Sequence, residues 1–198
     1  MNALIQKALL AGFLVLIAAC TRTEPVAQKF SLVDITGSPW GRDFQLTDHQ
    51  GAARSLADFR GKAVIMTFGY THCPDMCPMT LHKLSTALTQ MGKDAEQVQV
   101  LFVTLDPSRD TPKVLKQYAP AFHPTFLGMY ADELTTQRTA REFKVYFKQQ
   151  PADTSGFYTV DHMGPSFLFD PQGRLRLFFS DEHSVDMLVQ DLRTLLKG

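Results

Sequence analysis

The sequence has no excess of charge of either sign. Its 198 residues include 20 Lys and Arg and 20 Asp and Glu, so the formal net charge is zero, and Lys and Arg form no long run. A groove for nucleic acid needs a clustered basic face, so this composition argues against nucleic acid as a partner. Internal repeats and low-complexity tracts are also missing. The apolar fraction of 44% instead suits one packed domain with an appendage.

The sequence also lacks an apolar run long enough to span a bilayer, which takes about 20 residues. The run from Ala8 to Ala19 falls short of this length, follows Lys7 and ends at Cys20. A short apolar run behind a basic residue is typical of a signal peptide. Ile17-Ala-Ala-Cys20 resembles a bacterial lipobox, whose cysteine is acylated and becomes the first residue of the mature protein. An ordinary signal peptide cut nearby and a weak membrane anchor remain as alternatives.

The chain is expected to have three parts. Residues 1–19 are predicted to be a lipoprotein signal peptide, residues 20–39 a lipidated N-terminus and tether, and residues 40–198 the folded domain. The tether is inferred from the Thr, Ser and Pro content of residues 21–39. Phe30 and Leu32 are the tether residues expected to dock on the domain edge. This arrangement predicts a protein of the bacterial cell envelope, lipid-anchored to a membrane with its domain in the periplasm.

Cysteine is scarce, with only three residues in the chain. Lipidation of Cys20 leaves Cys73 and Cys77 as a pair, each followed by proline. They lie between an apolar strand pattern and a helical pattern of leucines. Two thiolates at this spacing can form a disulfide or hold a soft metal ion. The alternative of two buried structural thiols fits poorly with the surrounding prolines, Asp75 and His72, which indicate a loop.

Pro78 predicts where the helix after the cysteines begins. Proline has no N–H to donate and suits the first turn of a helix, so the helix is expected to start near Pro78 and to run to Met91. This puts Cys77 at the positive end of the helix dipole and Cys73 in the loop before it. Because a thiolate is stabilised there, both thiols are expected to have lowered pKa values.

Strand and helix patterns alternate along the domain. Thr111 and Asp132 are expected to cap two of the helices. The predicted strands cover residues 43–47, 63–68, 98–105, 126–130, 166–169 and 174–179, with a further short one at 158–160, and the predicted helices cover residues 78–91, 112–122, 133–143 and 184–196. This order predicts an α/β domain with a mixed sheet. A cysteine pair that ends the first central strand and opens a helix is the thioredoxin arrangement, here with one additional residue between the cysteines.

Five short stretches together resemble the Sco/SenC family of copper-binding, thioredoxin-like assembly proteins, from about Gly41 to the C-terminus. They are residues 43–51 (DFQLTDHQG), 68–78 (FGYTHCPDMCP), 104–112 (TLDPSRDTP), 160–163 (VDHM) and 169–173 (FDPQG). The resemblance implies a thioredoxin-like fold, with a central mixed sheet flanked by helices and an N-terminal strand extension. It also implies a copper site made of Cys73, Cys77 and His162.

The function implied by the resemblance is that of a copper chaperone. Such a protein delivers copper to, or prepares the cysteines of, the dinuclear copper centre of cytochrome c oxidase. The expected partners are the copper-site subunit of that oxidase, other periplasmic copper carriers or thiol reductants, and a membrane reached through a lipid on Cys20. Two other functions stay open. An envelope thiol–disulfide oxidoreductase would use only Cys73 and Cys77, as a redox-active pair, and a copper-sensing or buffering protein would bind the ion without turnover.

The donor set fits copper on chemical grounds as well. Cu(I) favours soft thiolates and Cu(II) adds a preference for imidazole, so two thiolates and one imidazole can hold either oxidation state. A closed structural zinc site takes four ligands, and the sequence offers only Asp75 or Asp161 as a fourth. His72 competes with His162, either as a ligand or as a cation that tunes Cys73.

Methionines near the site and the remaining histidines have other expected roles. Met79 is expected to pack in the core, whereas Met76 and Met163 are candidates to line the copper. The remaining histidines are expected at the surface: His49, His82, His123 and His183.

Two residues depart from the family pattern. Met163 stands where a small polar residue is common, and Pro165 follows it closely, immediately before the strand at 166–169. Thioredoxins carry a cis proline facing the cysteines at that place. The Gly164–Pro165 bond is therefore expected to be cis, which would favour thiol exchange.

Overall fold

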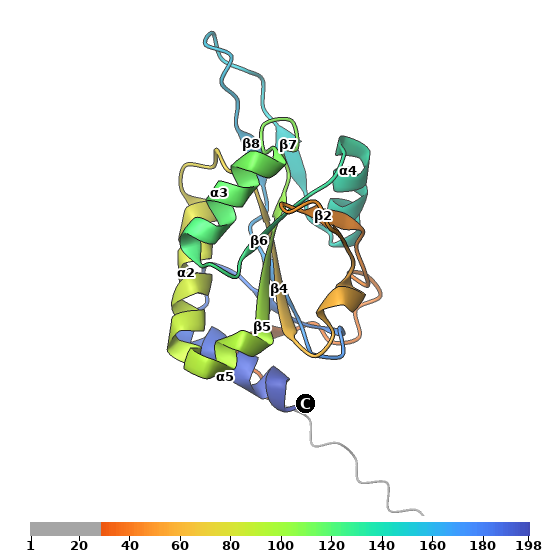
Figure 1. Cartoon of the computed structure of the whole chain (residues 1–198), viewed down its shortest axis with the longest axis vertical. Helices are drawn as coiled ribbons and strands as arrows, with labels where there is room; N and C mark the ends of the chain where they lie inside the picture. The colour runs from red at the N-terminus through yellow and green to blue at the C-terminus, as the bar shows by residue number, and fades with distance from the viewer. Residues whose placement is uncertain (1–28) are drawn as a thin grey trace, which may run out of the picture.

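An eight-stranded mixed sheet forms the centre of the computed structural model, which describes residues 29–198 (Figure 1). The predicted signal peptide and Cys20 lie outside the described residues. The strands β4, β5 and β6 are parallel neighbours, and the other pairings in this sheet are antiparallel. In sheet order the strands are β1 (Val33–Asp34), β10 (Leu175–Phe179), β9 (Ser166–Phe169), β4 (Ala63–Gly69), β5 (Val98–Thr104), β6 (Leu127–Tyr130), β2 (Leu46–Asp48) and β3 (Ala53–Arg54).

The strands β4 and β5 hold the middle of the sheet and are buried along their whole length. They pair in parallel, from Ala63 opposite Val98 to Gly69 opposite Thr104. Strands covered on both faces are expected to be almost continuously apolar, as these two are. Successive side chains alternate between two hydrophobic cores, so that Ile65 enters one core and the neighbouring Val64 and Met66 enter the other.

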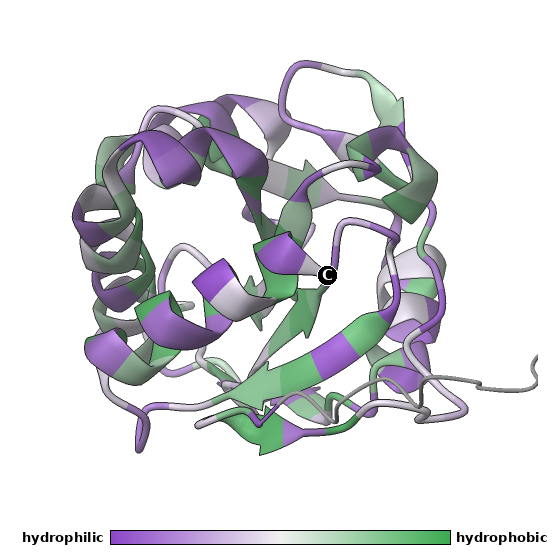
Figure 2. Ribbon diagram, turned by 90° about the horizontal axis from the view of Figure 1, so that it is seen from below, coloured by the Kyte–Doolittle hydropathy of each residue, from purple (hydrophilic) through white to green (hydrophobic). Residues whose placement is uncertain are grey.

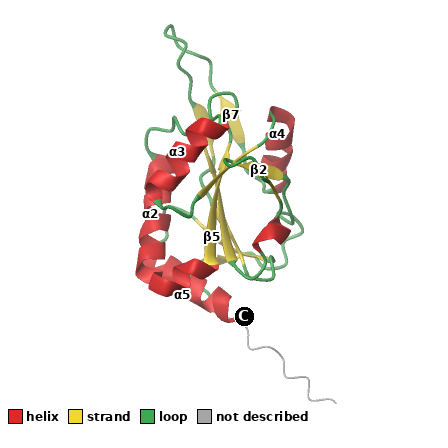
Figure 3. Ribbon diagram, in the orientation of Figure 1, coloured by secondary structure: helices red, strands yellow, loops and turns green. Residues whose placement is uncertain are grey.

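Helices cover both faces of the sheet (Figure 3). Three of them, α2 (Met76–Met91), α3 (Pro112–Phe122) and α5 (Val185–Lys197), contribute to the core that contains Ile65. The helix α4 (Glu133–Glu142) and the short 3₁₀ helix η1 (Leu56–Phe59) cover the opposite face. A second 3₁₀ helix, η2 (Gly92–Gln97), links α2 to β5. In Figure 2 the strands are predominantly hydrophobic, whereas the helices alternate polar and apolar residues, as expected for elements with one buried face.

Most of the helices begin where the capping residues in the sequence predict. Thr111, Asp132 and Ser184 each accept a hydrogen bond from a backbone N–H of the first turn, which confirms the predicted caps at Thr111 and Asp132. The helix α2, however, begins at Met76 rather than near Pro78. Pro78 still lies in the first turn, where its missing N–H is not needed.

The strand β8 (Val160–His162) pairs with β7 (Phe147–Gln149) in a separate two-stranded sheet, with His162 opposite Phe147. Residues 163–165 then link β8 to β9. The predicted cis bond before Pro165 is wrong, because residues 29–198 contain no cis peptide bond. Met163 N–H extends the pairing with β7 by donating to the Tyr146 carbonyl, and no tight local turn offsets the preference of X–Pro bonds for trans.

The N-terminal end of the described chain packs on the domain. Leu32 is buried in the core beneath α5, and β1 adds to the edge of the sheet beside β10. The backbone N–H groups of Ser31 and Leu32 both donate to Asp191 of α5, at 2.8 and 2.7 Å. Among the described helices, none is both long and apolar enough to cross a membrane.

Candidate metal centre

The candidate metal centre lies between the end of β4 and the start of α2, where Cys73, Cys77 and His162 come together. Within the described part of the chain they form a cluster whose ligand atoms all lie within 4.8 Å of one another. The Cys77 Sγ lies 3.3 Å from His162 Nε2, and the Cys77 N–H donates to Cys73 Sγ at 3.4 Å. Both cysteines are free thiols. Residues 85 positions apart in sequence are thereby placed around one point.

The end of β4 brings the helix very close to the sheet. Cys77 is almost fully buried, with 4% of its surface exposed, whereas Cys73 and His162 are partly exposed. Gly69 makes this approach possible, because a Cβ at that position would lie 2.6 Å from Cys77 Sγ. The cluster therefore has one inner sulfur and two outer donors.

The expectation of a lowered pKa is wrong for Cys77. Burial raises the pKa of the Cys77 thiol well above its ordinary value, and the neighbouring Cys73 and Asp110 add to this effect. The helix dipole at the start of α2 favours the Cys77 thiolate, but loss of solvent around the buried sulfur disfavours it more strongly. Without a metal ion, Cys77 is therefore a neutral thiol at neutral pH.

His162 is oriented for this thiol. Its Nδ1 donates to the Met163 carbonyl at 3.0 Å, and because a carbonyl can only accept, Nδ1 carries the ring proton in the neutral form. This leaves the lone pair of Nε2 directed at Cys77, whose S–H can donate to it. A backbone acceptor that fixes the tautomer of a histidine is the usual support of a metal-binding imidazole.

The loop after β5 braces the cysteine side of the cluster through Asp110, which is fully buried. The Asp110 carboxylate accepts hydrogen bonds from Thr71 N–H at 3.0 Å, Thr71 Oγ1 at 2.6 Å and Thr104 Oγ1 at 2.6 Å. These contacts fix the chain two residues before Cys73. His72 is exposed, with Nδ1 3.8 Å from Asp110 Oδ1, and it does not belong to the ligand cluster.

The same loop braces the histidine side through Arg109. Its guanidinium forms an ion pair with Asp106, donates to the Tyr158 carbonyl at 2.8 Å and stacks 3.5 Å from the centre of the Tyr158 ring. The Tyr158 hydroxyl donates to Asp106 at 2.9 Å. Tyr158 leads directly into β8, so these contacts position the strand that carries His162. From the sequence, this loop was predicted to supply the cap at Thr111 and carried part of the family resemblance, but its supporting role at the centre was not predicted.

Two other side-chain expectations are wrong. His49 is buried, and its Nδ1 accepts the N–H of Gly128 at 2.9 Å, because β2 pairs with β6 and covers the ring. Met79 is 45% exposed, because it lies off the face of α2 on which Leu81, Leu84 and Leu88 are buried. His82 is exposed as expected, and His123 and His183 are partly exposed.

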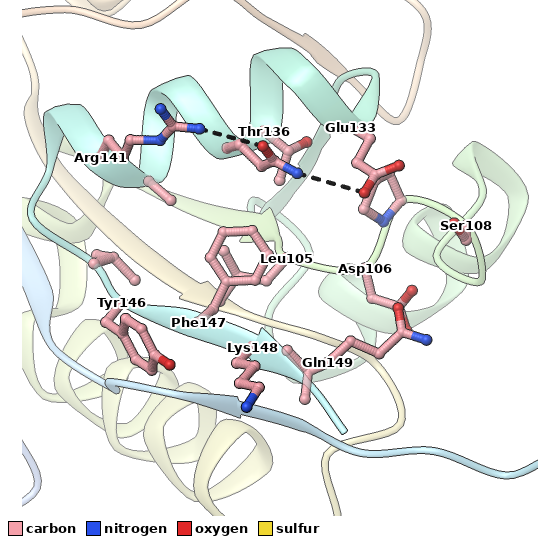
Figure 4. A pocket seen from close by; sticks show the side chains of 15 residues that line it. Leu105, Asp106, Ser108, Glu133, Thr136, Arg141, Tyr146, Phe147, Lys148 and Gln149 are labelled. Atoms are coloured by element: carbon pink, nitrogen blue, oxygen red, sulfur yellow. Dashed lines mark hydrogen bonds between the residues drawn. The ribbon is translucent and has the colours of Figure 1, made fainter. Parts of the chain in front are cut away.

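The hollow beside Cys77 and His162 is small. Its volume is about 10 Å³, and Met76, Thr80 and Gly164 are among its other lining residues. Such a volume is close to that of a single water, so the cluster suits an ion better than an organic substrate. A cavity of about 380 Å³ lies elsewhere, between α4, β7 and the loop after β5 (Figure 4). None of the three clustered residues lines it.

Comparison with known proteins shows similarity to one family. The profile of the SCO1/SenC family matches residues 32–197. The bovine mitochondrial SCO2 homologue is 37% identical over 153 residues, which is 76% of this chain but 58% of that protein. An SCO2-like protein of Rickettsia prowazekii is 31% identical over 185 residues, covering 93% of this chain and 88% of the relative. The chain thus spans little more than half the length of the mitochondrial relative.

Solved structures show the same fold. The structure of Bradyrhizobium japonicum ScoI with copper bound superposes with a TM-score of 0.71 at 37% identity, over 77% of this chain and 97% of that one. Copper-bound yeast Sco1 gives a TM-score of 0.72 at 32% identity, over 79% and 87% of the two chains. Apo Sco1 of Thermus thermophilus gives 0.75 at 36% identity, over 86% and 99%. These likenesses confirm the thioredoxin-like fold expected from the sequence.

Proposed function

This chain belongs to the SCO1/SenC family, and on that premise we propose that it carries copper to, or prepares the cysteines of, the dinuclear copper centre of cytochrome c oxidase. The observation that carries the proposal is the convergence of Cys73, Cys77 and His162 within 4.8 Å. Relatives 37% and 32% identical have been solved with copper bound. Two thiolates and an imidazole suit both oxidation states of copper.

Each of the three residues has a distinct part in holding the ion. The Cys77 sulfur binds from the protein interior and must release its proton when copper enters, so loading releases protons to solvent. Cys73 binds from the loop before α2. His162 offers the unprotonated Nε2, because its other ring nitrogen donates to the Met163 carbonyl. No rearrangement of the backbone is needed to bring the three donors together.

The unequal burial of the donors suits transfer of the ion. Cys73 and His162 are partly exposed, whereas Cys77 is buried. A partner that offers its own sulfur or nitrogen can therefore displace the outer donors first, while Cys77 still holds the copper. The copper-site subunit of the oxidase is the partner that we propose, with other periplasmic copper carriers or thiol reductants acting before it.

Thiol–disulfide exchange is the second candidate, since the Cys73 sulfur lies 3.4 Å from the Cys77 nitrogen and both cysteines are free. The burial that raises the pKa of the Cys77 thiol makes Cys77 a poor attacking group, because the thiolate is the nucleophile. Copper binding also uses His162, which disulfide exchange does not require. We therefore favour the copper function.

The test is the variant His162→Ala in the purified full chain. Cu(II) should lose its thiolate charge-transfer band, since two thiolates alone tend to reduce Cu(II), whereas Cu(I) binding should remain measurable because two thiolates satisfy that ion. Oxidase assembly in cells should fail, and reduction of a generic disulfide should survive. The matched control is His72→Ala, which changes a neighbouring histidine outside the cluster. Normal Cu(II) binding and normal oxidase assembly by His162→Ala would instead favour thiol exchange.

A further inference from the structure

Three exposed methionines lie close in sequence to the proposed ligands. Met76, Met79 and Met163 are 39%, 45% and 50% exposed, and they are among the few large hydrophobic side chains left in solvent within residues 29–198. Each is close in sequence to a proposed ligand, since Met76 precedes Cys77, Met79 follows it by two positions and Met163 follows His162. Exposed apolar surface has a cost in water, so these positions call for an explanation other than packing in the core.

Met76 differs from the other two because it lies beside two of the proposed ligands. It lines the small hollow that Cys77 and His162 also line. Its terminal methyl lies 3.7 Å from the point that a Cβ on Gly164 would occupy. The side chain therefore extends from the first turn of α2 toward the loop that follows β8, alongside the Cys77–His162 contact. Met79 does not line this hollow.

We propose that the Met76 thioether is a further sulfur donor for Cu(I), available when the His162 imidazole leaves the ion. This inference rests on the proposed copper function. Thioethers are soft ligands that favour Cu(I), whereas imidazole also suits Cu(II). Met76 would thus complete a set of three sulfurs with Cys73 and Cys77 while a partner approaches from the outer side. Exchanging a neutral nitrogen for a neutral sulfur moves no electron and no net proton.

A purely structural role for Met76 gives a different expectation. If the Met76 side chain only shields the Cys77–His162 contact from water, Met76→Leu should leave copper binding unchanged, because leucine is apolar and similar in volume to methionine. A ligand role requires the sulfur atom, which leucine lacks. The comparison of Met76→Leu with Met79→Leu therefore separates the two roles, since both change an exposed methionine on α2 and only Met76 lines the hollow.

The experiment measures copper binding by the full chain, with inorganic copper as the probe. Cu(I) affinity is determined without oxygen, by competition with a chromophoric chelator, in His162→Ala and in the double variants that add Met76→Leu or Met79→Leu. Adding Met76→Leu should weaken Cu(I) binding about tenfold or more, and adding Met79→Leu should not. X-ray absorption should show one sulfur fewer around Cu(I) after Met76→Leu. The Cu(II) band of the single variant Met76→Leu should match that of the wild type, which a general disturbance of the site would not allow.

Two results would overturn the inference. Equal Cu(I) affinity and an equal sulfur shell in the Met76→Leu and Met79→Leu double variants would show that the thioether does not bind, and the proposed copper function would stand. Failure of the wild-type chain to bind copper at all would remove the proposed function, and the role of Met76 with it. Thermal unfolding of each variant shows that affinities are compared between folded proteins.

Discussion

At the scale of single residues, Gly69 is the position where the candidate centre has least room. A Cβ there would lie 2.6 Å from Cys77 Sγ and 2.9 Å from Phe102 Cε2. Gly69→Ala should therefore destabilise the fold by about 1–3 kcal/mol through overpacking and displace Cys77, which weakens copper binding. Urea unfolding and a Cu(I) titration measure the two effects. Gly164→Ala is the control, because its nearest neighbour, the Met76 terminal methyl, lies at an ordinary contact distance of 3.7 Å. Equal behaviour of the two variants would refute the steric argument.

The residue types of the centre could be predicted from the sequence, whereas their surroundings could not. The family resemblance, carried by the cysteine motif and the later Asp-His pair, implied Cys73, Cys77 and His162 as the ligands. The pKa of Cys77 was predicted in the wrong direction because burial depends on how β4, β5 and α2 pack, which local sequence does not specify. The predicted exposure of His49 and the predicted burial of Met79 were wrong for the same reason. Which side of a short element faces the core is decided by its neighbours in space.

At the scale of elements, the loop between β5 and α3 connects the two halves of the centre. Arg109→Ala should remove the ion-pair partner of the buried Asp106 carboxylate and loosen Tyr158, whose hydroxyl still donates to Asp106, at a cost of about 3 kcal/mol. Because Tyr158 leads into β8, His162 should lose its position, and the Cu(II) band should decrease more than Cu(I) binding. Arg109→Lys should restore little, since lysine cannot reproduce the planar stack on Tyr158.

The control for Arg109→Ala is a surface ion pair. Arg193 and Asp94 are about half exposed and 3.7 Å apart, so Arg193→Ala should change stability by less than about 1 kcal/mol and should leave copper binding intact. If Arg109→Ala lost stability but kept the Cu(II) band of the wild type, the loop would support the fold without positioning His162. Unfolding in urea and absorption spectroscopy of the same samples decide the matter.

Asp191 of α5 joins the N-terminal strand to the domain, and this contact predicts a dependence on pH. Burial raises the pKa of the Asp191 carboxyl, although the N–H groups of Leu32 and Ser31 oppose the shift. A raised folded-state pKa means that the ionised form costs stability, and this cost disappears as the pH falls through the folded pKa toward the ordinary Asp value of 3.8. Wild type should therefore gain stability relative to Asp191→Asn between pH 7 and pH 4, measured by urea midpoints. If wild type instead lost stability relative to Asp191→Asn as the pH fell from 7 to 4, the folded protein would favour the ionised Asp191 carboxylate.

Helices and strands were predictable where the apolar pattern in the sequence was long. The short strands were not predictable. The residues that form β4, β5, α3 and α5 carry clear apolar periodicity or capping residues, and the predicted spans agree with the observed ones to within a few residues. The strands β1 and β7 have two and three residues, which is too few for a period to show. They exist because β10 and β8 offer partners, and partners distant in sequence leave no local signal.

At the scale of the whole molecule, the metal centre and the N-terminal attachment lie at different ends. The centre lies at the start of α2, whereas Ser31 and Leu32 are held by α5, which packs near the other end of α2 (Figure 1). A helix of 16 residues is about 24 Å long. The order of the strands that produces this separation was implied by the family resemblance only, because nothing in the local pattern places β9 between β10 and β4.

This polarity gives the proposed lipid anchor a testable consequence. If Cys20 is acylated, about 11 residues separate the lipid from Ser31, enough to span at most roughly 40 Å when extended. The tether would then attach to the end of the domain that carries α5, at the other end of α2 from the candidate copper centre. Cys20→Ser should therefore release the chain from the membrane fraction, or block its maturation, without changing copper binding by the purified protein. Cys73→Ser is the matched control and should stay in the membrane fraction while losing copper. Mass spectrometry of mature protein with an unmodified residue 20 would exclude the anchor, whatever the fractionation shows.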